Sequence, residues 1–159
     1  IGENSDYASI FGGAGNSINI TSPVANSDGS SIVGGEGNFI NGRISSIVGG
    51  ANNSIDSSST SGTSFIGGGA NNSITNDFSS IIGGSTNQIS GVYSSIIGGN
   101  NITGTQDNTV YVPKLVVTET YIPTGSTDTN GIVGEISYDG SFVYVKTASG
   151  WLRSTLSTF

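Results

Sequence analysis

Short apolar segments recur along the first two thirds of the chain, and each is framed by serine and glycine. Six segments carry Ser, two large apolar residues and then Gly-Gly, and they begin at Ser9, Ser31, Ser46, Ser64, Ser80 and Ser95. A second phrase, Asn-x-Ile, follows at a nearly constant distance and begins at Asn16, Asn38, Asn53, Asn72 and Asn87. Self-similarity at a period of about 15 residues is typical of proteins in which each repeat packs on its neighbours.

This period is too short for two helices and a loop, but it fits two short strands joined by two tight turns. Gly-Gly supplies the positive φ that one turn requires, and the Ser- and Asn-rich stretch supplies the other. Such coils stack about 4.8 Å apart, so each strand hydrogen-bonds to its counterparts above and below. We therefore predict an all-β parallel β-roll or solenoid over residues 1–105, with ladders of isoleucine and of asparagine amides. Extra residues lie between Ile18 and Ile32 and between Ile55 and Phe65, so insertions are expected at one corner only.

The two adjacent apolar residues of each segment point to opposite faces of a strand. One side chain can enter the narrow coil, and the other must point outward unless the strand bends to accommodate both. The outward row would present about 600 Å² of apolar surface, which is at the upper end for a soluble monomer. We therefore expect copies of the chain to pack along this row. The interface is assigned to Phe11, Val33, Val48, Ile66, Ile82 and Ile97.

The phrase Ser-Ile-Ile-Gly-Gly-x-x-Asn-x-Ile resembles the head repeats of trimeric autotransporter adhesins, whose short coils form a left-handed parallel β-roll in a tight trimer. It also resembles head-like repeats in bacteriophage fibre proteins. The resemblance covers residues 1 to about 105 and implies a homotrimer. The chain departs from the adhesin pattern in the second Gly, in the apolar doublet and in the Asn-x-Ile strand.

The composition changes after Gly104. Residues 106–130 are expected to form a neck and linker, because a dense apolar strand ending near Pro113 precedes a polar stretch. Residues 131–159 alternate as short strands, and the Asp-Gly pair at 139–140 predicts a two-residue hairpin turn. This last part is similar to small β-modules at the ends of phage tail fibres, so we expect an antiparallel β tip.

Aromatic and basic side chains gather in this tip. Tyr138, Tyr144 and Trp151 could form a receptor-binding surface, because aromatic rings stack on carbohydrate faces and offer a polar edge. Lys146 and Arg153 would then contact anionic host glycans. The competing interpretation is that the three rings form the core of a small β-module and that the two cations serve solubility or pairing between chains.

Charge and composition argue against several classes of protein. A net charge of −7 with only four Lys and Arg residues argues against binding to nucleic acid or to anionic membranes. No apolar run approaches the length of a membrane span. The absence of Cys and His excludes disulfides, the usual zinc sites and Ser-His-Asp triads. We expect no catalytic residues, no cofactor and no metal.

These patterns favour a non-enzymatic homotrimeric fibre segment through which a bacteriophage attaches to its host. The expected partner is a glycan or protein of the host cell surface, and the expected location is the virion. A phage is favoured over a bacterium because no coiled-coil stalk or membrane anchor follows the tip. The alternatives are the head of a bacterial surface adhesin, a purely structural virion spacer, and an ice-binding solenoid, although the last would need a Thr-rich face.

Overall fold

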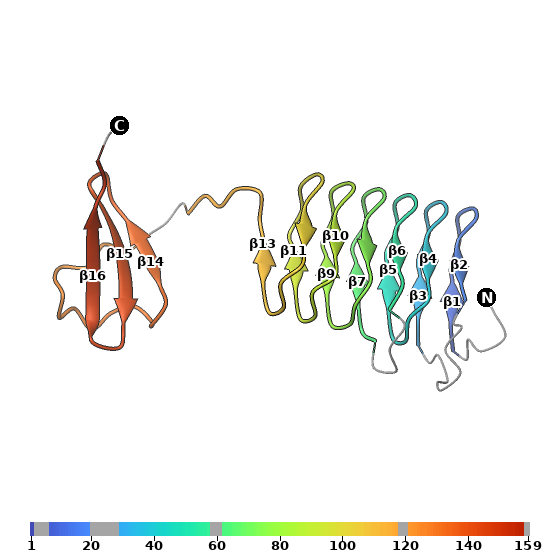
Figure 1. Cartoon of the computed structure of the whole chain (residues 1–159), viewed down its shortest axis with the longest axis horizontal. Coiled ribbons are helices and arrows are strands. Elements are labelled where there is room, and N and C mark those ends of the chain that lie inside the picture. The colour runs from blue at the N-terminus through green and yellow to red at the C-terminus, as the bar shows by residue number, and fades with distance from the viewer. Residues whose placement is uncertain (2–6, 20–28, 58–61, 118–120, 158–159) are drawn as a thin grey trace. The chain divides into compact units, whose positions relative to one another are not determined.

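The computed structural model describes the chain except for residues 2–6, 20–28, 58–61, 118–120 and 158–159. The described residues contain strands and turns and no helix. The chain divides into two compact units, Ile1–Pro113 and Lys114–Phe159. The first unit is a stack of parallel coils, and the second contains a small antiparallel sheet (Figure 1). The predicted parallel β-solenoid and the predicted antiparallel β-sheet are thereby confirmed.

Each complete coil of the first unit contributes one strand to each of two parallel sheets, and a last half-coil adds one more strand to the first sheet. Sheet 1 has seven strands, in the order β1 (Ser9–Ile10), β3 (Ser31–Ile32), β5 (Ser46–Ile47), β7 (Phe65–Ile66), β9 (Ser80–Ile81), β11 (Ser95–Ile96) and β13 (Val110–Tyr111). Sheet 2 has six strands, β2 (Ser17–Ile18), β4 (Phe39–Ile40), β6 (Ser54–Ile55), β8 (Ser73–Ile74), β10 (Gln88–Ile89) and β12 (Thr103–Gly104). Every neighbouring pair is parallel and in register, so equivalent residues of successive coils lie beside one another.

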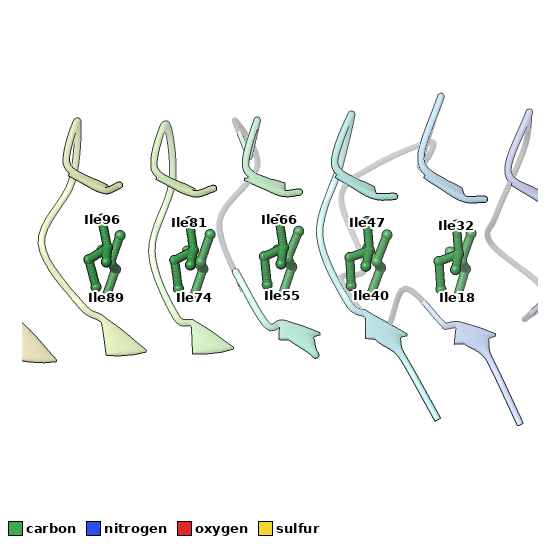
Figure 2. Packing of buried hydrophobic residues seen from close by; sticks show 10 residues of the cluster. All are labelled: Ile18, Ile32, Ile40, Ile47, Ile55, Ile66, Ile74, Ile81, Ile89 and Ile96. Atoms are coloured by element: carbon green, nitrogen blue, oxygen red, sulfur yellow. The ribbon is translucent and has the colours of Figure 1, made fainter. Parts of the chain in front are cut away.

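The core is a double row of isoleucines, with one row from each sheet. Figure 2 shows the two rows facing each other, for example Ile81 opposite Ile74 and Ile96 opposite Ile89. All ten members are fully buried, and they are Ile18, Ile32, Ile40, Ile47, Ile55, Ile66, Ile74, Ile81, Ile89 and Ile96. A coil this small has room for only two large side chains, which is why other inward positions are occupied by Ser and Asn.

The inward asparagines form a continuous amide ladder, as the sequence predicts. In the middle of the stack, the Nδ2 of Asn53 donates to the Oδ1 of Asn38 at 3.1 Å and to the carbonyl oxygens of Gly49 and Gly69 at 3.0 Å each. The backbone N–H of Asn53 also donates to the Oδ1 of Asn38. A second ladder of buried hydroxyls runs along another corner and consists of Ser30, Ser45, Ser64, Ser79 and Ser94.

Tight turns permit this stacking. The second glycine of each pair has a positive φ and lies against the next coil, so that a Cβ on Gly50 would approach the carbonyl oxygen of Gly69 to 2.0 Å. No side chain fits at that distance, and the glycine is therefore required by both conformation and space. The following turn uses Gly15, Gly37, Asn52, Asn71, Thr86 or Asn101 at its positive-φ position, mostly residue types that tolerate that region.

The repeat length is 15 residues except at two coils. Successive ladder asparagines are separated by 22, 15, 19 and 15 residues. Both longer coils carry their extra residues between a strand of sheet 2 and the next strand of sheet 1. The parts of these insertions at residues 20–28 and 58–61 lie outside the described residues.

The ladder continues beyond residue 105, where the sequence suggested that the repeats end. In β13, Tyr111 pairs with Ile96 and occupies the core position, while Gly104 takes the place of isoleucine in sheet 2. A Cβ on Gly104 would meet the Tyr111 ring at 2.7 Å, so the ring fills the space that the missing side chain leaves. The expected neck strand thus stacks on the solenoid as its last half-coil.

The second unit contains sheet 3, with antiparallel strands β14 (Ile136–Tyr138), β15 (Phe142–Thr147) and β16 (Gly150–Thr155). The predicted hairpin is present, but its turn is displaced by one residue. Tyr138 pairs with Val143, and the N–H of Asp139 donates to the carbonyl oxygen of Phe142. This pairing makes Gly140 and Ser141 the central residues of the turn. The Asp139 carboxylate stabilises the turn by accepting hydrogen bonds from the N–H groups of Ser141 and Phe142.

Candidate functional site

The outer face of sheet 1 carries a row of exposed apolar side chains along the solenoid. Five of the six residues assigned to the interface lie in this row, with exposed fractions of 75% for Phe11, 48% for Val33, 45% for Val48, 49% for Ile82 and 51% for Ile97. Val112 in the last half-coil extends the row and is 41% exposed. These side chains point outward because the preceding residue of each pair, such as Ile81 or Ile96, points into the core.

Ile66 is the exception, and its assignment to the outward row is corrected. Ile66 pairs with Ile47 and is fully buried, so the residue that points outward in this coil is Gly67. Three glycines follow Ile66, so the sequence pairs Ser64 with Ser46 of the preceding repeat, whereas in the structure Phe65 pairs with Ser46. The ring of Phe65 lies 3.4 Å from where a Cβ of Gly67 would be, so the row remains apolar here through Phe65.

A second group of exposed apolar side chains lies at the corner that precedes sheet 1, and the sequence reasoning missed it. Tyr7, Ile44, Phe78 and Tyr93 adopt positive φ values between 48° and 58°, a region that bulky residues seldom occupy. The rings of Phe78 and Tyr93 stack with centroids 5.0 Å apart. The signal in the sequence is a large residue two positions before the Ser of the phrase.

The outer face of sheet 2 is different in character. Most of its outward positions are polar, as at Ser54, Asp56, Thr75, Gln88 and Ser90, and Phe39 is the apolar exception. The solenoid is therefore one-sided, with apolar side chains along sheet 1 and hydroxyl, amide and carboxylate groups along sheet 2.

The three rings proposed for receptor contact do not form an exposed platform. Trp151 and Tyr144 are only 4% and 7% exposed, and they form the core of the second unit. The Nε1 of Trp151 donates to the carbonyl oxygen of Asn130 at 2.9 Å, and the Tyr144 hydroxyl donates to Asp139 Oδ2 at 2.6 Å. Tyr138 is 45% exposed. The burial of Trp151 and Tyr144 agrees with the competing interpretation, in which these rings are structural.

The two cations of the tip also have partners within the chain. Lys146 donates through Nζ to the carbonyl oxygen of Asp128 at 2.6 Å and lies 5.4 Å from the centroid of the Trp151 ring. The guanidinium carbon of Arg153 lies 4.4 Å from the centroid of the Phe142 ring. Arg153 is nevertheless exposed to solvent, so its guanidinium can take a further partner.

A loop before sheet 3 is organised around one carboxylate. Asp128 accepts hydrogen bonds from the Tyr121 hydroxyl, from the backbone and side chain of Thr124, and from Asn130. The Tyr121 hydrogen bond, followed by the backbone donors, holds the pKa of Asp128 well below its ordinary value, and the same contact raises the pKa of Tyr121. In the turn of sheet 3, the Tyr144 hydroxyl likewise lowers the pKa of Asp139.

A pocket of about 280 Å³ lies between this loop and sheet 3. Its lining includes Pro123, Thr124, Gly125 and Ser126 from the loop and Tyr144, Trp151 and Arg153 from the sheet. Three of the residues proposed for receptor contact therefore border one concavity. The mixture of backbone groups, buried ring edges and one guanidinium suits a small polar ligand better than stacking on a flat sugar face.

The described residues contain no group of three or more His, Cys, Asp and Glu side chains that could hold a metal ion. Within the same part of the chain, no helix is long and apolar enough to cross a membrane. Comparisons with models of protein families, with curated proteins and with solved structures give no match to this chain.

Proposed function

We propose that the chain is a non-enzymatic segment of a homotrimeric attachment fibre, of the kind that a bacteriophage carries on its virion to bind a host cell. The observation that carries the proposal is the single apolar row along sheet 1, from Phe11 to Val112. The number three follows from the resemblance of the repeats to trimeric heads, and the row itself argues for association of more than one copy.

The size and position of this row favour self-association. The five assigned residues and Val112 are between 41% and 75% exposed, and together they present roughly 600 Å² of apolar surface, near the upper limit for a soluble monomer. With the corner residues Ile44, Phe78 and Tyr93, the apolar surface approaches the roughly 800 Å² that each partner buries in a standard interface. A repeating flat surface is best matched by another copy with the same coil spacing.

The solenoid has the properties that a fibre requires. Each coil is hydrogen-bonded to its neighbours through two sheets and two side-chain ladders, so local opening requires several contacts to break together. Attachment would gain from several copies, because linked sites reinforce one another through a high effective concentration. The pocket beside Arg153 is the candidate contact for a host glycan or protein.

The burial of Trp151 and Tyr144 favours a second candidate function, a purely structural spacer in the virion. A spacer would need the association along sheet 1 but no ligand at the tip. Binding of the labelled wild-type oligomer to whole bacterial cells of candidate hosts separates the two functions, because a spacer would not be retained on the cell surface.

The proposal is tested by measuring the mass of the chain in solution. Light scattering should give a trimer for the wild type, whereas Ile82→Asp should give monomers because a carboxylate would be buried in an apolar interface. Ser90→Asp is the matched control, since it lies in the same coil on sheet 2, where Asp56 already occupies the equivalent position. A wild-type monomer, or an Ile82→Asp variant of unchanged mass, would contradict the proposed interface.

A further inference from the structure

Sheet 3 of the second unit has one bare apolar face. Ile136, Val145 and Leu152 are aligned across the three strands and are 60%, 38% and 63% exposed. Tyr138 and Val143 form the neighbouring pair on the same face, because residues two apart in a strand point to the same side. The Tyr138 hydroxyl donates to the carbonyl oxygen of Val117 at 2.8 Å, so the uncovered part of the face is that of Ile136, Val145 and Leu152. None of these five side chains is charged.

The opposite face of sheet 3 is covered within the unit. Trp151 and Tyr144 are buried there, and the loop that contains Asn130 and Asp128 hydrogen-bonds to Trp151 and Lys146. The loop therefore forms a second layer on this face of the sheet, whereas Ile136, Val145 and Leu152 on the other face are left exposed by the described residues. A β-sheet with two apolar faces needs a cover on both.

The core of this unit is too small to explain its stability alone. Among the described residues of Lys114–Phe159, the buried apolar side chains are those of Pro123, Tyr144 and Trp151. Domains of about 40 to 60 residues are marginal unless disulfides, a metal or association supplements the core. The chain has no cysteine, and the described residues offer no metal cluster, which leaves association.

We propose that the bare face of sheet 3 packs against the same face of other copies of this chain, so that the tip completes its core between subunits. Absence of charge on the face lets copies with a net charge of −7 meet without bringing like charges together. The face presents roughly 400 Å², about half of what a standard interface buries per partner. The inference therefore rests on the proposed function, since association of the solenoids supplies the effective concentration that the tips need.

The two faces of the tip would then have different roles, one in association and the other in ligand binding. Tyr138, which the sequence suggested for receptor contact, lies on the face between subunits. The pocket beside Arg153 borders Trp151 and Tyr144 on the opposite face and stays open to a ligand. Contact with a host would then involve the loop at Pro123–Ser126 and not Tyr138, the aromatic residue of the bare face.

The test uses the full chain, which contains no natural cysteine. Single variants Ile136→Cys, Val145→Cys and Leu152→Cys place one thiol on each strand of the bare face, and Ser149→Cys in the exposed turn is the control. Because a disulfide needs Cα atoms within about 7 Å, mild oxidation should cross-link at least one face variant between chains about tenfold faster than the control. Rates for all three face variants that equal the Ser149→Cys rate would overturn the inference.

The mass of the wild-type chain separates this result from a failure of the proposed function. A wild-type oligomer in light scattering whose face variants do not cross-link leaves the solenoid interface in place and overturns the tip interface alone. A wild-type monomer contradicts association of the solenoids and removes the effective concentration on which the tip interface depends.

Discussion

At the scale of single residues, buried asparagines distinguish this solenoid from an apolar core. Asn53 is fully buried, and each of its side-chain atoms that can hydrogen-bond has a partner in a neighbouring coil or turn. A satisfied amide ladder holds the turns in register, whereas the isoleucine rows alone would tolerate sliding. The repeated Asn-x-Ile phrase made the ladder predictable, because an inward polar residue needs a partner and its counterpart one coil away is the nearest.

Replacement of Asn53 by alanine tests the ladder. Asn53→Ala should lower the free energy of unfolding by roughly 3 kcal/mol, since it leaves the carbonyl oxygen of Gly49 and the N–H of Asn72 without partners. It also removes one of the two donors to the carbonyl oxygen of Gly69, which keeps the N–H of Ala51. Urea unfolding measures the change. Asn100→Ala is the control, because Asn100 is exposed and its position is alanine in three other coils. Equal losses in both variants would show that the ladder adds nothing.

The sequence did not predict positions at which one residue replaces the side chain that a neighbour lacks. At Gly67 the outward aliphatic side chain is missing and the Phe65 ring lies over the space, which a motif compared position by position does not reveal. The roles of Trp151 and Tyr144 were left open for a related reason, because a ring that can stack on a sugar can equally fill a core. Only the position of the loop around Asp128 decides between these roles.

At the scale of elements, the strands of the solenoid are only two residues long, so a coil is stabilised by stacking and not by its own strands. The last coil therefore needs a cover for its open end. Tyr111 provides one, since its ring fills the space at Gly104, its hydroxyl accepts the N–H of Gln106 at 2.8 Å, and it packs against the core. The sequence did not reveal this cover, because Tyr111 and Gly104 match neither repeated phrase.

Removal of the cover should loosen the last coil and leave the middle of the stack intact. We expect Tyr111→Ala to cost about 2 kcal/mol, less than the loss of a fully buried ring because Tyr111 is partly exposed. Hydrogen exchange of the amides at Thr103–Gln106 should become faster, while that of Ile47 should not change. Tyr93→Ala removes an exposed ring in the neighbouring coil as a control. Uniformly faster exchange along the solenoid would contradict a local role for Tyr111.

At the scale of the whole molecule, the sequence predicted the solenoid well and the second unit in part. The coils share one pattern, in which isoleucines of the two sheets are buried against each other, so a wrong prediction at a single position such as Ile66 does not change the predicted fold. The second unit occurs once, and its alternating strands predicted the antiparallel sheet but not which face the loop at Tyr121–Asn130 covers. The distribution of buried residues differs accordingly, with ten fully buried isoleucines in the first unit and two buried rings in the second.

This difference predicts two unfolding transitions. Trp151 is the only tryptophan of the chain and is buried in the second unit, so its emission reports that unit alone, while far-UV circular dichroism reports mainly the solenoid. We expect the Trp151 transition to occur at the lower temperature, because a core of two rings stabilises less than ten isoleucines. Transitions that coincide for both signals would indicate a single cooperative molecule.

The Trp151 transition also tests whether association of the solenoids stabilises the tip. If copies complete the core of the tip, a variant that separates the solenoids must also weaken the tip by mass action, although the substitution lies in another unit. Ile82→Asp should therefore lower the Trp151 midpoint by about 5 °C or more, and dilution of the wild type should lower it in the same direction. Ser90→Asp should leave the midpoint unchanged. A Trp151 midpoint that is independent of both Ile82→Asp and concentration would show that the tip folds without its copies.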